Sequence, residues 1–202
     1  MESDEPGTVV DMGWELGPAH RQSLLSLARC ALTDFLIDGF IQPIESQEPI
    51  FLQPRGVFVT LWRHDNGDLR GCRGEPRPQR PLIEAVVLMT IAAAIDDPRF
   101  LPVVAEELPL LKIEINILTQ PQPILRQQIE IGRHGLLIEG PQDGGLLLPE
   151  VALRHHMNLD EFLTTLCAKA HLPEGAWRNP DCRLYAFETL VLLEDVQSMA
   201  TD

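Results

Sequence analysis

The chain has 202 residues, of which 45% are hydrophobic and 23% are charged, an ordinary composition for a globular protein. Its net charge of −14 disfavours binding to nucleic acid or to an anionic membrane, because phosphate groups would repel most of the surface. No apolar run approaches the roughly 18 residues that span a bilayer, and the acidic N-terminus does not resemble a secretory signal. We therefore expect a cytoplasmic protein without a membrane segment.

The first 54 residues predict an arm, a helix and a connector. Residues 1–18 have few periodic apolar positions and predict a flexible or loosely docked arm, so we place the folded domain at residues 19–196. Apolar residues at helical spacing predict a helix over residues 20–37, and three prolines predict a non-helical connector over residues 40–54.

The four cysteines lie far apart without a CxxC pair, which argues against a zinc ribbon or a disulfide framework. We expect Cys30 and Cys167 to be buried within helices.

The remainder of the chain mixes strands and helices. Residues 56–63 and 69–73 predict a hairpin around the turn sequence DNGD, and a helix follows Pro81. Strands are predicted at residues 111–118, 135–139, 145–148 and 182–193, with short helices at 151–156 and, capped by Asp160, up to 170. The order lacks βαβ regularity. It predicts an α+β fold with a mainly antiparallel sheet flanked by helices.

The second hairpin strand ends in the sequence Arg70-Gly71-Cys72-Arg73-Gly74. Residues 55–80 contain six arginines and three acidic residues, a local charge of +3 in an acidic protein. Three interpretations are open: a structural strand in which glycines permit tight packing, a site for a ligand or partner, and a cysteine nucleophile. As a nucleophile Cys72 would also need a base, and no histidine is tied to it by spacing.

Anion binding is one form of the ligand interpretation. Glycine-linked amides with Arg70, Arg73 and Arg77 could hold a phosphate or carboxylate, whereas the alternative is an arginine cluster that balances nearby acids. Asp96, Asp97 and Arg99 form a charged loop that could bind a metal or act in acid–base chemistry, or could be a helix-ending turn locked by an Asp–Arg pair. We expect ligand contacts from seven residues: Arg70, Gly71, Cys72, Arg73, Gly74, Asp97 and Arg99.

Several functional classes lack their motifs here. There is no Gly-x-Ser-x-Gly elbow, phosphate loop or dinucleotide fingerprint, so we expect no cofactor. The adjacent His155 and His156 would point about 100° apart on a helix and would not reach one ion together, so we expect no metal site.

Several ordered segments resemble the AMMECR-one domain family, whose microbial members are called AmmeMemoRadiSam system protein A. LRGCRG resembles the signature LRGCIG, and GVFVTL, DDPRF, HGLLIEG, LLLPEVA, FLTTLCAKA and RLYAFE follow in family order over about residues 20–194. The chain departs from the family pattern at three positions. Arg73 replaces isoleucine and adds a charge beside Cys72, Glu150 replaces glutamine, and His171 replaces glycine.

The resemblance implies a compact α+β protein with a smaller inserted or appended part. It also implies a shared pathway with a Memo-type protein and a radical-SAM protein, and a functional signature whose activity is not established. We therefore expect the signature to bind a small anionic ligand or a partner protein. The alternatives are an enzyme with Cys72 as nucleophile and an acidic scaffold that docks partners.

Overall fold

The computed structural model describes residues 16–195. The arm predicted over residues 1–18 lies outside this range except for its last three residues, of which Leu16 is buried in the core and Pro18 begins the first helix. Within residues 16–195, no helix is both long enough and apolar enough to cross a membrane.

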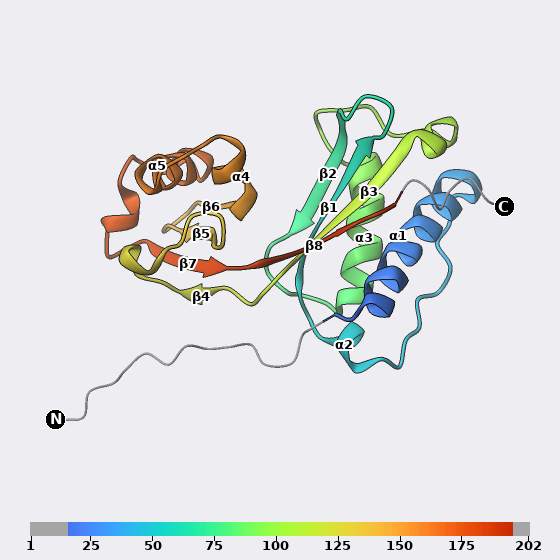
Figure 1. Cartoon of the computed structure of the whole chain (residues 1–202), viewed down its shortest axis with the longest axis horizontal. Helices are drawn as coiled ribbons and strands as arrows, with labels where there is room; N and C mark the ends of the chain where they lie inside the picture. The colour runs from blue at the N-terminus through green and yellow to red at the C-terminus, as the bar shows by residue number, and fades with distance from the viewer. Residues whose placement is uncertain (1–15, 196–202) are drawn as a thin grey trace.

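The larger of two lobes is built on a four-stranded antiparallel sheet in the order β2-β1-β3-β8. Its strands are β1 (Gly56–Arg63), β2 (Leu69–Glu75), β3 (Leu111–Leu118) and β8 (Thr189–Leu193). The helices α1 (Pro18–Asp38) and α3 (Leu82–Ile95) cover one face of this sheet (Figure 1). Inward residues of neighbouring strands, such as Val59 and Ile115, are fully buried beneath them.

The other face of this sheet, which we call the open face, is polar. It carries the alternate residues of the same strands, including Thr60 and Trp62 of β1 and Glu114 and Asn116 of β3. Both long helices lie on the opposite side, and the open face is turned toward the second lobe (Figure 1).

The small lobe is an insertion into the large one. Its sheet has the antiparallel order β4-β7-β5-β6, with β4 (Gln122–Pro123), β5 (Gly135–Glu139), β6 (Gly144–Leu147) and β7 (Arg183–Phe187). The helices α4 (Pro149–Arg154) and α5 (Leu159–Lys169) pack beside it, and α5 buries Phe162 and Leu166. All these elements lie between β3 and β8, which are neighbours in the first sheet. The predicted α+β fold with a smaller subdomain is confirmed.

The strand predicted over residues 182–193 is two strands that belong to different sheets. The chain leaves β7 at Glu188 and enters β8 in the large lobe. There the backbone N–H of Thr119 donates to the carbonyl of Glu188 at 2.9 Å, and the N–H of Glu188 donates to the hydroxyl of Thr119 at 2.8 Å. These two residues lie where the chain crosses between the lobes and belong to neither sheet. Their hydrogen bonds to each other satisfy backbone groups that have no strand partner there.

A small apolar cluster joins the lobes. It contains Leu118 at the end of β3, Leu137 and Leu146 of the second sheet, and Phe187, with Phe58 packed against them. Because this cluster draws side chains from both sheets, it helps to hold the small lobe against the open face.

Three local predictions were wrong. Residues Pro49–Leu52 form a one-turn helix, α2, because a proline fits the first turn and Phe51 is buried there. The cap of α5 is Asn158, whose side chain accepts from the N–H groups of Asp160 and Glu161 at 3.0 and 3.1 Å. Cys30 is exposed, because it lies on the outward side of α1, whereas Cys167 is buried as predicted.

Candidate functional site

The signature forms β2, which lies at an edge of the first sheet and contains a bulge at Arg70. The register shifts between Leu61 and Trp62, so Arg70 has no residue opposite it on β1. A bulge redirects the side chain of the extra residue. The Arg70 guanidinium donates to both carboxylate oxygens of Glu107 at 2.7 and 2.8 Å, and to the carbonyl of Leu101 at 3.0 Å. The hydrogen bonds from Arg70 lower the pKa of Glu107.

The two glycines of the signature allow close packing on opposite sides of the strand. A Cβ atom added to Gly71 would lie 2.0 Å from the carbonyl oxygen of Ala93 in α3. At Gly74 it would lie 2.2 Å from the ring of Phe58. Both glycines therefore have the packing role that the structural interpretation of the signature assigns to them.

Cys72, between these glycines, faces the small lobe. Its half-buried side chain lies on the open face, where the Thr60 hydroxyl donates a hydrogen bond to Sγ at 3.3 Å. Its backbone N–H points out from the sheet edge and donates to Oδ2 of Asp97 at 2.8 Å. Asp97 thus holds the backbone of Cys72 from the sheet edge and Thr60 holds its sulfur from β1, while the thiol remains partly accessible.

The loop after α3 is locked by Asp97. Its buried carboxylate accepts from the Arg99 guanidinium at 2.6 and 2.9 Å, from the backbone N–H of Arg99 at 3.1 Å, and from Cys72. These hydrogen bonds, chiefly those from the Arg99 side chain, hold the pKa of Asp97 well below its usual range. The Arg99 guanidinium also lies over the ring of Phe100, 5.5 Å from its centroid. Of the two interpretations of this loop, the geometry matches the locked turn, and it places Asp97 and Arg99 beside Cys72.

Other arginines of the basic region pair with acids that lie near them or come from distant segments. Arg73 contacts Asp96 at 2.9 Å, and Arg77 contacts Glu139 of the small lobe. Within the region, Arg80 pairs with Glu75 at 3.1 Å, and Arg63 with Asp65 at 2.8 Å. The local charge of +3 counted along the sequence is therefore compensated in space by carboxylates such as Asp96, Glu107 and Glu139.

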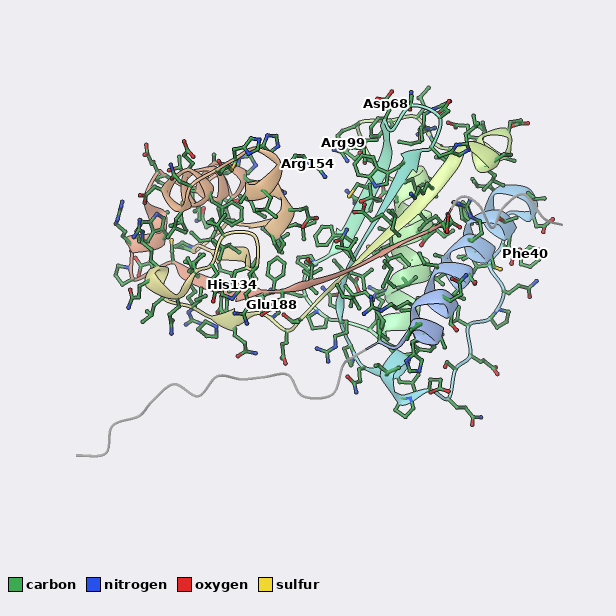
Figure 2. The ribbon with its side chains drawn as sticks, viewed as in Figure 1. Phe40, Asp68, Arg99, His134, Arg154 and Glu188 are labelled. Atoms are coloured by element: carbon green, nitrogen blue, oxygen red, sulfur yellow. The ribbon has the colours of Figure 1, made fainter. Side chains whose placement is uncertain are left out.

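The two lobes face each other across a set of polar side chains. We call this set the interlobe face, and it comprises Thr60, Cys72, Glu114, Asn116, Glu150 of α4 and Lys169 of α5. Lys169 remains open to solvent, yet desolvation by the surrounding protein lowers its pKa, with repulsion from Arg99 acting in the same direction and attraction to Cys72 opposing it. Figure 2 shows Arg99 of the large lobe and Arg154 of α4 on the two margins of this region.

The acidic end of the interlobe face is more enclosed. Glu114 accepts from the indole N–H of Trp62 at 3.1 Å and from the Asn116 amide at 2.8 Å. Burial raises the pKa of Glu150, and the nearby charge of Glu114 adds to this effect. The amide oxygen of Asn116 is buried without a hydrogen-bond partner among residues 16–195. A lysine with a lowered pKa and a glutamate with a raised pKa thus lie on one surface, a combination that is common at functional sites.

Comparisons with known proteins agree on one family. The AMMECR1 family model matches residues 25–192. Protein MK0488 of Methanopyrus kandleri is 40% identical over 194 residues, which are 91% of this chain and 93% of that protein. The chain belongs to the AMMECR1 family. Protein PF1979 of Pyrococcus furiosus is 39% identical over 182 residues, covering 85% of this chain and 87% of that protein. The crystal structure of uncharacterized protein PH0010 from Pyrococcus horikoshii has a TM-score of 0.78 at 38% identity, covering 86% of this chain and 90% of that one.

The departures from the AMMECR1 family pattern at positions 73 and 171 have structural consequences. Arg73 pairs with Val59 across the sheet, so its side chain leaves the strand on the side opposite to Cys72. The prediction of an added charge beside Cys72 was therefore wrong. His171 has a φ of 55°, a left-handed conformation that glycine adopts without strain. The glycine of the family pattern suits this position, and the histidine strains it by about 1 kcal/mol.

The sequence interpretation did not find most of the AMMECR1 interlobe face. Lys169 and Glu150 come from helices of the small lobe, and only the tertiary structure brings them to the open face. A signal existed for β3, because Lys112, Glu114 and Asn116 alternate with buried isoleucines. That alternation predicts a polar face, although it does not show what lies opposite. Within residues 16–195, no three histidine, cysteine or acidic side chains are grouped so that they could hold a metal ion.

Replacing Glu150 by glutamine, the residue of the AMMECR1 pattern, is expected to stabilise this protein at neutral pH. The folded state holds the Glu150 proton more tightly than the unfolded state, because burial raises the pKa. Stability from this group is complete below the unfolded pKa of about 4.3 and is lost as pH rises through the folded pKa. At pH 7, E150Q should therefore be more stable to urea than the wild type by on the order of 1 kcal/mol, whereas at pH 4 the two proteins should unfold at the same urea concentration. The exposed E174Q serves as the control, and a gain that is the same at both pH values would contradict the explanation.

Proposed function

We propose that this AMMECR1-family protein binds a small anionic molecule at the interlobe face, with Lys169 as its principal contact. One observation carries the proposal. Lys169 approaches Arg99 and Cys72 from the other lobe, and among residues 16–195 no carboxylate lies within ion-pair distance of it. A cation kept without a partner in a protein of net charge −14 is a good contact for a ligand.

The local charges favour an anion over a neutral ligand. Lys169 and Arg99 are close enough to repel each other, and Asp97 compensates only one of the two charges. An anion between them would relieve this repulsion and accept charge-assisted hydrogen bonds. The Cys72 thiol, whose sulfur accepts a hydrogen bond from the Thr60 hydroxyl, adds an uncharged donor.

The proposal assigns two roles to the residues predicted from the signature. Cys72 and Arg99 are placed in contact with the ligand. Arg70 and Arg73 are engaged with carboxylates, and Gly71 permits the packing that positions the strand. Asp97 holds Cys72 and Arg99 together, so it is a positioning residue.

Thermal unfolding in the presence of inorganic phosphate tests the proposal. We expect phosphate at constant ionic strength to raise the Tm of the wild type, because a ligand that binds only the folded state stabilises it. K169M should lose this shift. R21M is the matched control, because it removes one positive charge from α1 on the opposite side of the sheet. An equal shift in K169M and the wild type would contradict the site.

The same samples test a second candidate, a nucleophilic Cys72. The observation in its favour is that Cys72 lies near Lys169 and Arg99 and accepts from Thr60, surroundings in which cysteines act as nucleophiles. If this is its role, iodoacetamide should modify Cys72 faster than the more exposed Cys30, and phosphate should slow only the former. If iodoacetamide modifies Cys72 more slowly than Cys30, Cys72 is not an activated nucleophile, and the enzymatic candidate is wrong while the binding proposal stands.

A further inference from the structure

A cavity lies at the hairpin end of the open face. Its volume is about 340 Å³, and its lining includes Trp62, Lys112, Glu114 and Leu193. This volume is within the range of small-molecule sites, and the lining combines an aromatic ring, an aliphatic side chain and charged groups. Trp62 pairs with Lys112 across the sheet, and Glu114 also belongs to the interlobe face.

Lys112 and Lys169 are the two lysines of the chain, and both reach the open face. Neither has a carboxylate within ion-pair distance among residues 16–195, whereas arginines such as Arg70 and Arg80 are paired. A surface with two cations kept without partners matches a ligand that carries two negative charges.

The spacing between Lys112 and Cys72, the residue that interacts with Lys169, follows from the sheet. Cys72 lies on β2 beside Lys169, and Lys112 lies on β3, with β1 between these strands. Two strand spacings are about 10 Å. Lys112 also lies two residues along β3 from Glu114, which is in register with Cys72, so the backbone positions of Cys72 and Lys112 are about 12 Å apart. Between the two positions lie Thr60 and the indole ring of Trp62, whose N–H is held by Glu114 at 3.1 Å.

We propose that the cavity is a second anion subsite and that the ligand is an elongated molecule with an anionic group at each end. One group contacts Lys169 and the other contacts Lys112, while the apolar middle lies over Trp62. Glu114 keeps its negative charge, but its oxygens are turned toward Trp62 and Asn116, from which they accept hydrogen bonds, and Arg63 lines the cavity together with Lys112. The inference rests on the proposed function, since it places one end of the ligand at Lys169.

Calorimetric titration of the full chain with two series of linear carboxylates tests the inference. Monocarboxylates and dicarboxylates of equal chain length bury the same apolar middle, so a difference between them reports the second charge. We expect dicarboxylates with end groups about 12 Å apart to bind about tenfold more tightly than the matching monocarboxylates. K112M should remove this difference and leave monocarboxylate binding unchanged. R21M should behave as the wild type.

The outcomes separate this inference from the proposed function. If monocarboxylates bind through Lys169 but dicarboxylates bind no more tightly, the second subsite is wrong and the proposed function stands. If K112M weakens both series equally, Lys112 does not contact the far end of the ligand, and the inference is also wrong. If neither series binds the wild type, both the proposed function and the inference are overturned.

Discussion

Replacing Gly71 by alanine is expected to destabilise the protein by about 3 kcal/mol or more. The new Cβ would lie 2.0 Å from the Ala93 carbonyl oxygen, and both partners belong to the backbone of packed elements. Neither can rotate away, so β2 must separate from α3. That movement would also lengthen the hydrogen bond between the Cys72 N–H and Asp97. Urea unfolding of the variant should show the loss as a lower midpoint.

Gly74 provides the matched control. An added Cβ there meets the ring of Phe58, a side chain that can rotate, so G74A should cost about 1–2 kcal/mol. If G71A unfolds at the same urea concentration as the wild type, the strand and the helix are not in the close contact that the structure shows. Equal losses in the two variants would mean that rigid backbone contact is not the cause of the larger effect.

Replacing Glu194 by alanine is expected to cost about 3–5 kcal/mol, because it leaves a largely buried guanidinium without its counter-charge. The carboxylate of Glu194, which is 8% exposed, contacts the Arg29 guanidinium of α1 through both oxygens and accepts the backbone N–H of Ile113 at 3.0 Å. Arg29 also donates to the carbonyl of Leu111 at 2.8 Å. One side chain thus ties the end of β8 to β3 and α1.

A surface ion pair provides the comparison for this prediction. Arg133 and Glu188 are 2.9 Å apart but both are about half exposed, so E188A should cost less than about 1 kcal/mol. Urea unfolding of the two variants measures the difference. In a double-mutant cycle, R29M combined with E194L should cost less than the sum of the single changes, because no buried charge is left unpaired. Additive costs would show that the pair does not act as a unit.

Local sequence patterns were sufficient to predict the hairpin that carries the signature and the strand that pairs with it. The Asn66-Gly67 turn predicted the hairpin, and Gly67 has the positive φ, 78°, that such turns need. The strand predicted at residues 111–118 is β3, and its alternating isoleucines are buried on one face. These predictions held because they depend on neighbours along the chain. The break at Glu188 was missed because residues 182–193 are apolar enough for one strand, and only the pairing with two sheets divides them.

The sequence by itself determined the α+β class, the signature hairpin and membership of the AMMECR1 family, since each follows from local order and spacing. The tertiary structure decided which charges are compensated. Arg70 of the signature, for example, pairs with Glu107, which is far from it in the sequence and lies beside it only in the folded protein. It also decided that Lys169 comes to Cys72 from an inserted lobe. The candidate site therefore depends on how two lobes pack, which residue spacing along one chain does not encode.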